Sequence, residues 1–118
     1  MGTGSPGGSN IIQYVTKTLV GVIDWGMDAQ QATSMVDFGA GNSVTTNVGG
    51  EHPNIDISNG GANDALITGL RALGHTVTGA AQSSGISTIL RISQDNGKPA
   101  WAGGADTRRE GLVLGDGL

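Results

Sequence analysis

The sequence lacks cysteine and is poor in aromatic and charged residues. The absence of cysteine excludes disulfide bonds and thiol chemistry. Aromatic residues make up only 3% of the chain, so the core has to be built from aliphatic side chains and alanine. Apolar runs fall well short of the roughly 20 residues that a membrane-spanning helix needs. We therefore expect no membrane span.

Positive charge is also scarce. The chain has 6 Lys and Arg against 10 Asp and Glu, which gives a formal net charge of -4. Proteins that bind nucleic acid usually carry a basic patch or stripe. Because the sequence has no such stripe, nucleic acid is not an expected partner.

Glycine, in contrast, is abundant, with 22 residues among the 118 of the chain. This content predicts tight turns and close approaches of the backbone. The segments between the glycines are too periodic for a disordered chain. The length is enough for one domain with a modest core, so we expect a single domain over residues 1–118.

The first two predicted elements are helices. Ser9 is a candidate N-cap and Gly26 a candidate stop for a helix over residues 9–25. Its apolar face, expected in the core, consists of Ile12, Val15, Leu19, Val22 and Ile23. A capping box at residues 28–31 begins a short second helix that ends near Val36.

The rest of the chain predicts more strand than helix. Residues 37–54 form a polar, turn-rich segment that we expect to be a mobile loop. Short strands are predicted at "NIDIS" (54–58) and "HTVTG" (75–79), with a helix at about 61–73 between them. A hairpin follows, with "GISTILRIS" and "PAWAGGA" joined through Asn96-Gly97. This order predicts an α+β fold, with a mainly antiparallel sheet and helices packed on it.

The N-terminal stretch "MGTGSPGGSN" matches the G-x-G-x-x-G spacing of dinucleotide-binding loops. Such a loop needs a preceding strand and an acidic residue at the end of a second strand. Only Met1 precedes Gly2, and Asp24 falls inside a predicted helix. A phosphate loop needs a lysine, and none occurs before Lys17. We therefore expect no cofactor.

The same loop also fits an anion other than a cofactor phosphate, namely an oxyanion that forms during a reaction. Gly7 and Gly8 lie where a helix begins, with unpaired N–H groups and a partial positive charge. Two adjacent N–H donors at such a place can form an oxyanion hole. In the alternative interpretation, the two glycines only turn the chain into the helix.

Several segments resemble the gamma-glutamyltranspeptidase (glutathione hydrolase) family. "TGSPGGSNII" (3–12) resembles the family's signature, "DWGMDAQQATS" (24–34) its second helix, and "LRALGHTV" (70–77) a later segment. "GKPAWAGGADTRREG" (97–111) is similar to the closing motif, with Asp106, Arg108 and Gly111 at matching positions. The resemblance implies part of an N-terminal-nucleophile hydrolase αββα sandwich and identifies Gly7 and Gly8 as the oxyanion hole.

The resemblance also implies what this chain does not contain. In the family, a threonine at the start of the small subunit attacks the gamma-glutamyl carbonyl and forms an acyl-enzyme. That threonine and the serines that hold the glutamate lie upstream of the matched segment, and Thr3 lies inside the signature. The chain therefore corresponds to the C-terminal part of the small subunit. Alone, we expect it to be inactive, and its substrate-binding residues are unknown.

The expected partners follow from this interpretation. They are the large subunit, the N-terminal part of the small subunit and, in the complete enzyme, gamma-glutamyl substrates such as glutathione. The resemblance implies a periplasmic or secreted protein, although the sequence itself does not indicate a location. Because an incomplete sandwich exposes sheet edges and an apolar face, the isolated chain could form a homodimer.

Two pairs of residues invite a catalytic or metal-binding role. Asp106 and Arg108 could form a charge pair near an active site, but we assign them a structural role that holds the C-terminal segment. His52 and His75 are far apart in sequence and have no clear carboxylate partners, so no metal site is predicted.

Two further pairs of residues, two serines and two tryptophans, are assigned structural roles. No histidine is placed to activate Ser83 or Ser84, so we interpret them as a turn before a strand. Trp25 and Trp101 are expected in the core or at a subunit contact.

Two other functions stay open. The chain could be a stand-alone, non-catalytic binding or regulatory module with this fold. It could also be part of a related acylase that acts on a beta-lactam side chain.

Overall fold

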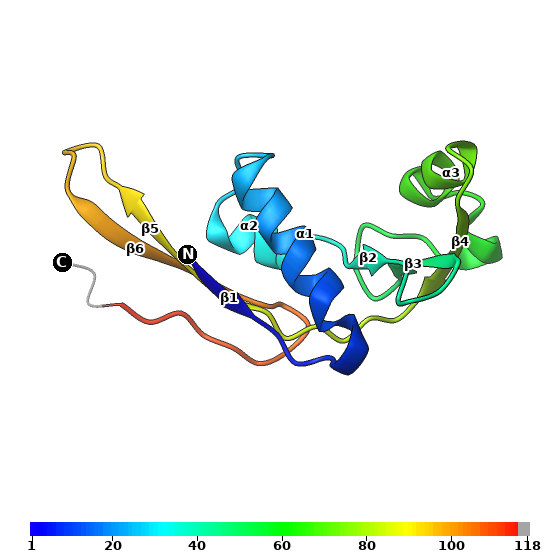
Figure 1. The fold of residues 1–118 in the computed structure, drawn as a ribbon, viewed down its shortest axis with the longest axis horizontal. Coiled ribbons are helices and arrows are strands. Elements are labelled where there is room, and N and C mark those ends of the chain that lie inside the picture. Colours follow the sequence, from blue (N-terminus) through cyan, green and yellow to red (C-terminus); the bar gives the residue numbers. More distant parts are fainter. Residues whose placement is uncertain (116–118) are drawn as a thin grey trace. The chain divides into compact units, whose positions relative to one another are not determined.

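The computed structural model describes residues 1–115 and divides the chain into two compact units. Unit 1 combines residues 1–35 with the part of the chain that begins at Ser84, and unit 2 is Val36–Ser83. Each unit has its own three-stranded sheet (Figure 1). The sequence did not indicate this division. The combination of sheets and packed helices confirms the predicted α+β class.

The sheet of unit 1 is antiparallel, with the order β1-β5-β6. Strands β5 (Ser87–Ser93) and β6 (Pro99–Ala105) form the predicted hairpin, and Gly97 in its turn has a φ of 78°. Strand β1 (Gly2–Gly4) was not predicted, and it pairs with β5 in an antiparallel sense. A dinucleotide-binding unit needs parallel strands, so this pairing gives a further reason against a nucleotide loop.

The helices of unit 1 begin with a 3₁₀ turn, η1 (Gly8–Asn10), followed by α1 (Ile11–Ile23) and α2 (Ala29–Ser34). Helix α2 has the predicted capping box: the Asp28 carboxylate accepts from the Gln31 N–H at 2.7 Å, and the Gln31 side chain accepts from the Asp28 N–H at 3.0 Å. The prediction of Ser9 as N-cap is wrong, because Ser9 lies inside the 3₁₀ turn and α1 has Asn10 as its N-cap.

The buried face of α1 is not the one that the apolar pattern predicts. Ile12 is 76% exposed and Ile23 is 71% exposed. The buried residues of the helix are instead Tyr14, Lys17, Thr18 and Gly21. They follow the i, i+3, i+4, i+7 spacing of a single helix face. The prediction of a buried Ile12 and Ile23 is therefore wrong.

Close approach of α1 to α2 accounts for this choice of face. A Cβ atom placed on Gly21 would lie only 3.2 Å from the Cβ of Ala32. Beside this contact, the buried ammonium of Lys17 donates to the carbonyl oxygens of Ala32 (3.1 Å), Thr33 (3.0 Å) and Met35 (2.7 Å). The last carbonyls of a helix have no partner within it. Lys17 therefore closes the C-terminal end of α2, which an isoleucine could not do.

We predict that Lys17→Met lowers the free energy of unfolding of the chain by about 2–4 kcal/mol, because buried carbonyls at the end of α2 lose their donor. Urea denaturation followed by circular dichroism measures this difference. Lys98→Met is the matched control, since Lys98 is exposed in the hairpin turn. Equal stability of the two variants would show that the Lys17 hydrogen bonds contribute nothing.

The inner face of the unit 1 sheet includes Thr88 and Leu90 of β5, whereas Ile92 on the same face is 42% exposed. Thr88 and Leu90 are buried, and α2 packs closely over the neighbouring strand. A Cβ atom on Gly104 would lie 2.4 Å from the Ala29 carbonyl oxygen, so only glycine fits there. The Thr88 hydroxyl lies 3.0 Å from those of both Thr3 and Thr33, which links β1, β5 and α2.

Unit 2 contains strands β2 (Phe38–Gly39), β3 (Thr45–Gly49) and β4 (Thr76–Ala80) in the order β2-β3-β4. The β2–β3 pair is antiparallel, whereas β3 and β4 are parallel. Residues 37–54 therefore include regular structure that the sequence did not predict, while their mobility stays a prediction. The strand predicted at 54–58 is wrong, because no strand covers these residues.

A short 3₁₀ segment, η2 (Ser58–Gly61), precedes helix α3 (Ala65–Ala72). The Asp64 side chain caps α3 by accepting from the Ile67 N–H. At the other end, Gly74 has a φ of 98°, and the His75 N–H bonds back to Leu70, which is a Schellman motif. The helix predicted at about 61–73 is thus confirmed over Ala65–Ala72, with Leu73 as its C-cap and Gly74 directly after it. The core of unit 2 consists of Val48, Ile67 and Val77.

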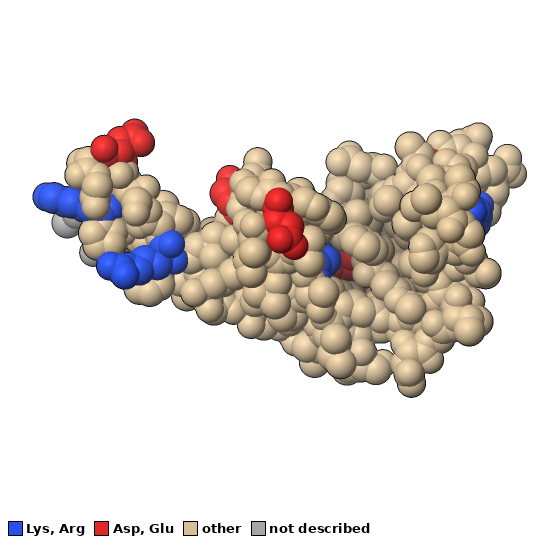
Figure 2. All heavy atoms as spheres, turned by 45° about the horizontal axis from the view of Figure 1, so that its top comes forward, with Lys and Arg blue, Asp and Glu red and all other residues tan. Residues whose placement is uncertain are grey.

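The surface carries few charges. Figure 2 shows the described Lys, Arg, Asp and Glu side chains in small, separate groups among uncharged atoms. Trp25 and Trp101 are 55% and 69% exposed, so the core role predicted for them is wrong and the subunit contact stays a prediction. None of the helices in residues 1–115 combines the length and the apolarity that crossing a membrane requires.

Candidate functional site

The loop between β1 and α1 places two glycines side by side in conformations that favour glycine. Gly7 has a φ of 143° and Gly8 a φ of 59°. The Gly7 carbonyl accepts from the Asn10 N–H at 3.1 Å. Within residues 1–115, the N–H groups of Gly7 and Gly8 have no protein acceptor. Two adjacent donors are therefore available where the helical segment begins.

The N-terminal part of this loop, at Ser5 and Pro6, is bonded to the segment that leads into β5. The Ser5 hydroxyl accepts from the Gly85 N–H at 2.9 Å and donates to the Pro6 carbonyl. A Cβ atom on Gly85 would lie 3.0 Å from the Pro6 ring and 2.6 Å from Arg109 Cδ. The loop is therefore fixed to the strand that pairs with β1.

The surroundings of the two glycines differ. A Cβ atom on Gly7 would lie 2.5 Å from Cε2 of Tyr14, whose side chain is buried. A Cβ atom on Gly8 would meet nothing within 4 Å. Gly7 therefore excludes a side chain both by its φ and by contact with an aromatic ring, and Gly8 by its φ alone.

Asp106 is the centre of a second polar group, at the end of β6. Its buried carboxylate accepts from the Ser84 hydroxyl and, at 3.0 Å, from the Ile86 N–H. Arg108 donates to it at 3.0 Å from both its backbone N–H and its guanidinium. The ion pair with Arg108 is itself buried. The guanidinium of Arg108 also donates to the Met35 carbonyl at 2.9 Å, the same oxygen that Lys17 contacts.

Burial by itself raises the pKa of Asp106. The hydrogen bonds from Ile86, Ser84 and Arg108 outweigh burial and hold the pKa of Asp106 below the usual value for aspartate. A lowered pKa means that the folded protein prefers the charged carboxylate. The charge then stabilises the fold above the unfolded pKa of about 3.9, and this contribution is lost as the pH falls through the folded-state value.

We predict that Asp106→Asn lowers the free energy of unfolding by about 3 kcal/mol near neutral pH, because it breaks a buried ion pair. The difference from the unsubstituted chain should stay constant down to about pH 5 and shrink at more acidic pH. Urea denaturation across pH 3–7 measures both effects. Asp95→Asn, in the exposed hairpin turn, is the control. A difference that is independent of pH would contradict the role of the Asp106 charge.

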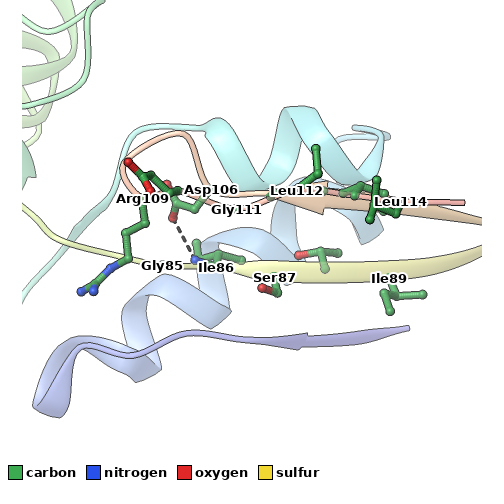
Figure 3. A pocket seen from close by; sticks show the side chains of 15 residues that line it. Gly85, Ile86, Ser87, Ile89, Asp106, Arg109, Gly111, Leu112 and Leu114 are labelled. Atoms are coloured by element: carbon green, nitrogen blue, oxygen red, sulfur yellow. Dashed lines mark hydrogen bonds between the residues drawn. The ribbon is translucent and has the colours of Figure 1, made fainter.

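A cavity of about 350 Å³ lies between strands β5 and β6 and the segment that follows Asp106. Figure 3 shows Ser87 and Ile89 on one side of it and Leu112 and Leu114 on the other. Val113 packs where a Cβ atom of Gly103 would lie. The lining is a mixture of strand backbone and exposed apolar side chains, and Gly7 and Gly8 are not part of it.

The other residues singled out by the sequence do not gather into a site. Residues 1–115 hold no group of three or more His, Asp or Glu that could bind a metal ion. His52 and His75 both lie in unit 2. Ser84 is a hydrogen-bond donor to Asp106, so its hydroxyl has a structural contact.

Sequence reasoning missed the roles of Tyr14 and Lys17 and the contact of Ser84 with Asp106. Tyr14 and Lys17 share a helix face with Thr18 and Gly21, and the small residues on that face indicate where another helix can approach. Ser84 has no such signal, because its contact with Asp106 joins residues 22 positions apart.

A comparison with models of known protein families shows which family this chain belongs to. The model of the family described as gamma-glutamyltranspeptidase matches residues 1–115. The chain belongs to the gamma-glutamyltranspeptidase family. No curated protein sequence gives a significant match.

Solved structures share the fold of this family member. A gamma-glutamyltranspeptidase mutant from Helicobacter pylori matches 91% of this chain with a TM-score of 0.71 and 22% identity. A transpeptidase from Bacillus anthracis, CapD, matches 98% with a TM-score of 0.68 and 22% identity. A cephalosporin acylase from Bacillus halodurans matches 95% with a TM-score of 0.70 and 19% identity. At these identities the likeness shows the fold alone.

These matches cover only part of the solved chains. The aligned region spans 53% of the Helicobacter chain, 62% of the Bacillus anthracis chain and 19% of the acylase chain. This member of the gamma-glutamyltranspeptidase family thus spans about half the length of the first of these neighbours.

Proposed function

We propose that this chain is the C-terminal part of the small subunit of an enzyme that cleaves gamma-glutamyl amide bonds. In this proposal, the N–H groups of Gly7 and Gly8 form its oxyanion hole. The observation that carries the proposal is the pair of adjacent N–H donors, without a protein acceptor, in the segment that resembles the family signature. The gamma-glutamyltranspeptidase family match over residues 1–115 supports it.

The chemistry of acyl transfer explains what the two donors would do. When a nucleophile adds to the gamma-glutamyl carbonyl, the C=O π electrons move to oxygen and a tetrahedral oxyanion forms. Collapse of this species breaks the C–N bond, and the amine leaves with the proton that the nucleophile has lost. The acyl-enzyme that remains is then cleaved by water or by an acceptor amine. Donors that are already oriented toward the oxyanion stabilise the transition state by about 3 kcal/mol each.

The nucleophile would come from the part of the enzyme that this chain does not cover. Thr3 is poorly suited to the role, because it lies in strand β1 and its hydroxyl contacts that of Thr88 at 3.0 Å. We therefore infer that the isolated chain is inactive. Glutathione and related gamma-glutamyl amides are the substrates proposed for the complete enzyme.

In the complete enzyme, Gly7→Val should lower kcat for a chromogenic gamma-glutamyl anilide by at least about 100-fold, because the side chain displaces one donor. Gly69→Ala is the matched control, since a Cβ atom on Gly69 in α3 meets nothing within 4 Å. Steady-state kinetics of both variants give the comparison. A Gly7→Val enzyme with unchanged turnover would overturn the assignment of the oxyanion hole.

A beta-lactam acylase is the second candidate function. The observation that favours it is the likeness to the cephalosporin acylase from Bacillus halodurans, with a TM-score of 0.70. Both reactions pass through a tetrahedral oxyanion, so Gly7 and Gly8 would serve either. Assaying the complete enzyme with a gamma-glutamyl anilide and with a cephalosporin that carries an acyl side chain separates the two. A complete protein with neither activity would favour a non-catalytic binding module.

The remainder of the enzyme is also the partner that we propose for the exposed apolar side chains of unit 1. Ile12 and Ile23 protrude from α1, and Ile89 and Trp101 lie on the outward face of β5 and β6. Exposed apolar surface of this kind is typical of an interface. In the isolated chain, a second copy can cover part of it.

We therefore expect the isolated chain to sediment as a dimer at micromolar concentration, and replacement of Ile89 and Trp101 by serine to shift it toward monomer. Val44→Ser, at a position 95% exposed in unit 2, is the control. Analytical ultracentrifugation measures the shift. The parts of residues 37–54 outside β2 and β3, together with residues 110–115, should exchange amide hydrogens quickly. A clean monomer with strong protection throughout would contradict this prediction.

A further inference from the structure

Tyr14 is the buried residue of α1 that lies against the backbone of Gly7. Tyr14 is only 2% exposed. Its ring carbons Cε2 and Cδ2 would lie 2.5 Å and 3.0 Å from a Cβ atom placed on Gly7. The Tyr14 backbone is part of α1, where its carbonyl accepts from the Thr18 hydroxyl at 2.9 Å. The first of the two adjacent glycines therefore lies against a buried aromatic side chain.

Among the glycines that have positive φ, such a contact occurs at Gly7 and also at Gly61, where an added Cβ atom would lie 2.6 Å from Cδ1 of Ile67. An added Cβ atom would meet nothing within 4 Å at Gly8, Gly26, Gly60, Gly74 and Gly97. Those glycines are explained by their turn conformations alone. At Gly7 the φ of 143° also comes with close contact to a side chain. A change of direction in the chain does not require such a contact.

We infer that Tyr14 is a positioning residue for the Gly7 and Gly8 N–H donors, an inference that rests on the proposed function. Glycine at a φ of 143° has wide conformational freedom, so Gly7 can relax unless something restrains it. Before it, the chain is held by the hydrogen bond between Ser5 and Gly85. After it, the Gly7 carbonyl accepts from the Asn10 N–H at 3.1 Å, and the Tyr14 ring adds a contact at Gly7 itself.

The consequence for catalysis follows from how an oxyanion hole works. Its donors stabilise the transition state because they are already oriented when charge develops on the oxygen. A displacement of about 1 Å can lower the rate by about 100-fold. Removal of the Tyr14 ring should therefore affect the chemical step more than substrate binding.

The test uses the complete enzyme with Tyr14→Phe and Tyr14→Leu. Phe keeps the ring against Gly7, so kcat should stay within about twofold of the unsubstituted enzyme. Leu removes the planar surface, so kcat should fall by about 10- to 100-fold with little change in KM. Val48→Ala, in the core of unit 2, is the control for general loss of stability. Thermal unfolding of every variant is measured alongside.

A second measurement does not depend on activity. Hydrogen–deuterium exchange of the peptide that spans residues 5–11 reports on the backbone around Gly7 and Gly8. Exchange in this peptide should become faster in Tyr14→Leu and stay unchanged in Tyr14→Phe and Val48→Ala. If Tyr14→Leu folds too poorly for kinetics, its exchange measurement is made instead on Tyr14→Met, whose flexible side chain fills irregular gaps in a core.

The outcomes separate this inference from the proposed function. Tyr14→Leu with unchanged kcat and unchanged exchange would overturn the inference and leave the proposed function intact. The inference would also be overturned if Tyr14→Leu lowered kcat no more than Val48→Ala does at a similar loss of thermal stability. If the unsubstituted complete enzyme cleaves neither substrate, the proposed function fails, and exchange alone then decides whether Tyr14 orders the loop.

Discussion

The buried ammonium of Lys17 is the contact on which the arrangement of unit 1 depends. It donates to three carbonyl oxygens at the C-terminal end of α2 and so joins the two helices through polar bonds. One of these oxygens, on Met35, also accepts from Arg108, whose partner Asp106 holds the start of β5 through Ser84 and Ile86. A single polar network therefore connects both helices, β5 and the segment after β6.

The same contact determines which face of α1 is buried, and this bears on the proposed site. Tyr14 lies one turn before Lys17 on the buried face. When Lys17 reaches the end of α2, the Tyr14 ring is brought against Gly7. The geometry of the two glycine N–H groups thus depends on helix packing as well as on the glycine-rich loop. The exposed isoleucines on α1 are the other consequence of this orientation.

Local signals predicted several elements correctly, because each depends on residues close together in the chain. The capping box at Asp28, the hairpin at Asn96-Gly97 and the helix α3 are of this kind. Strand β1 and the buried face of α1 were not predictable in this way. Strand β1 exists only through its pairing with β5, and the α1 face through contacts with α2.

The sequence by itself determined the family resemblance, the α+β class and the adjacent glycines at the start of a helix, because these are properties of short motifs. Only the tertiary structure decided that Lys17 is buried, that Ile12 is exposed and that Tyr14 lies against Gly7. The physical reason is that an apolar pattern shows which face of a helix avoids water. It does not show which face of the helix forms hydrogen bonds and close packing contacts with the rest of the chain.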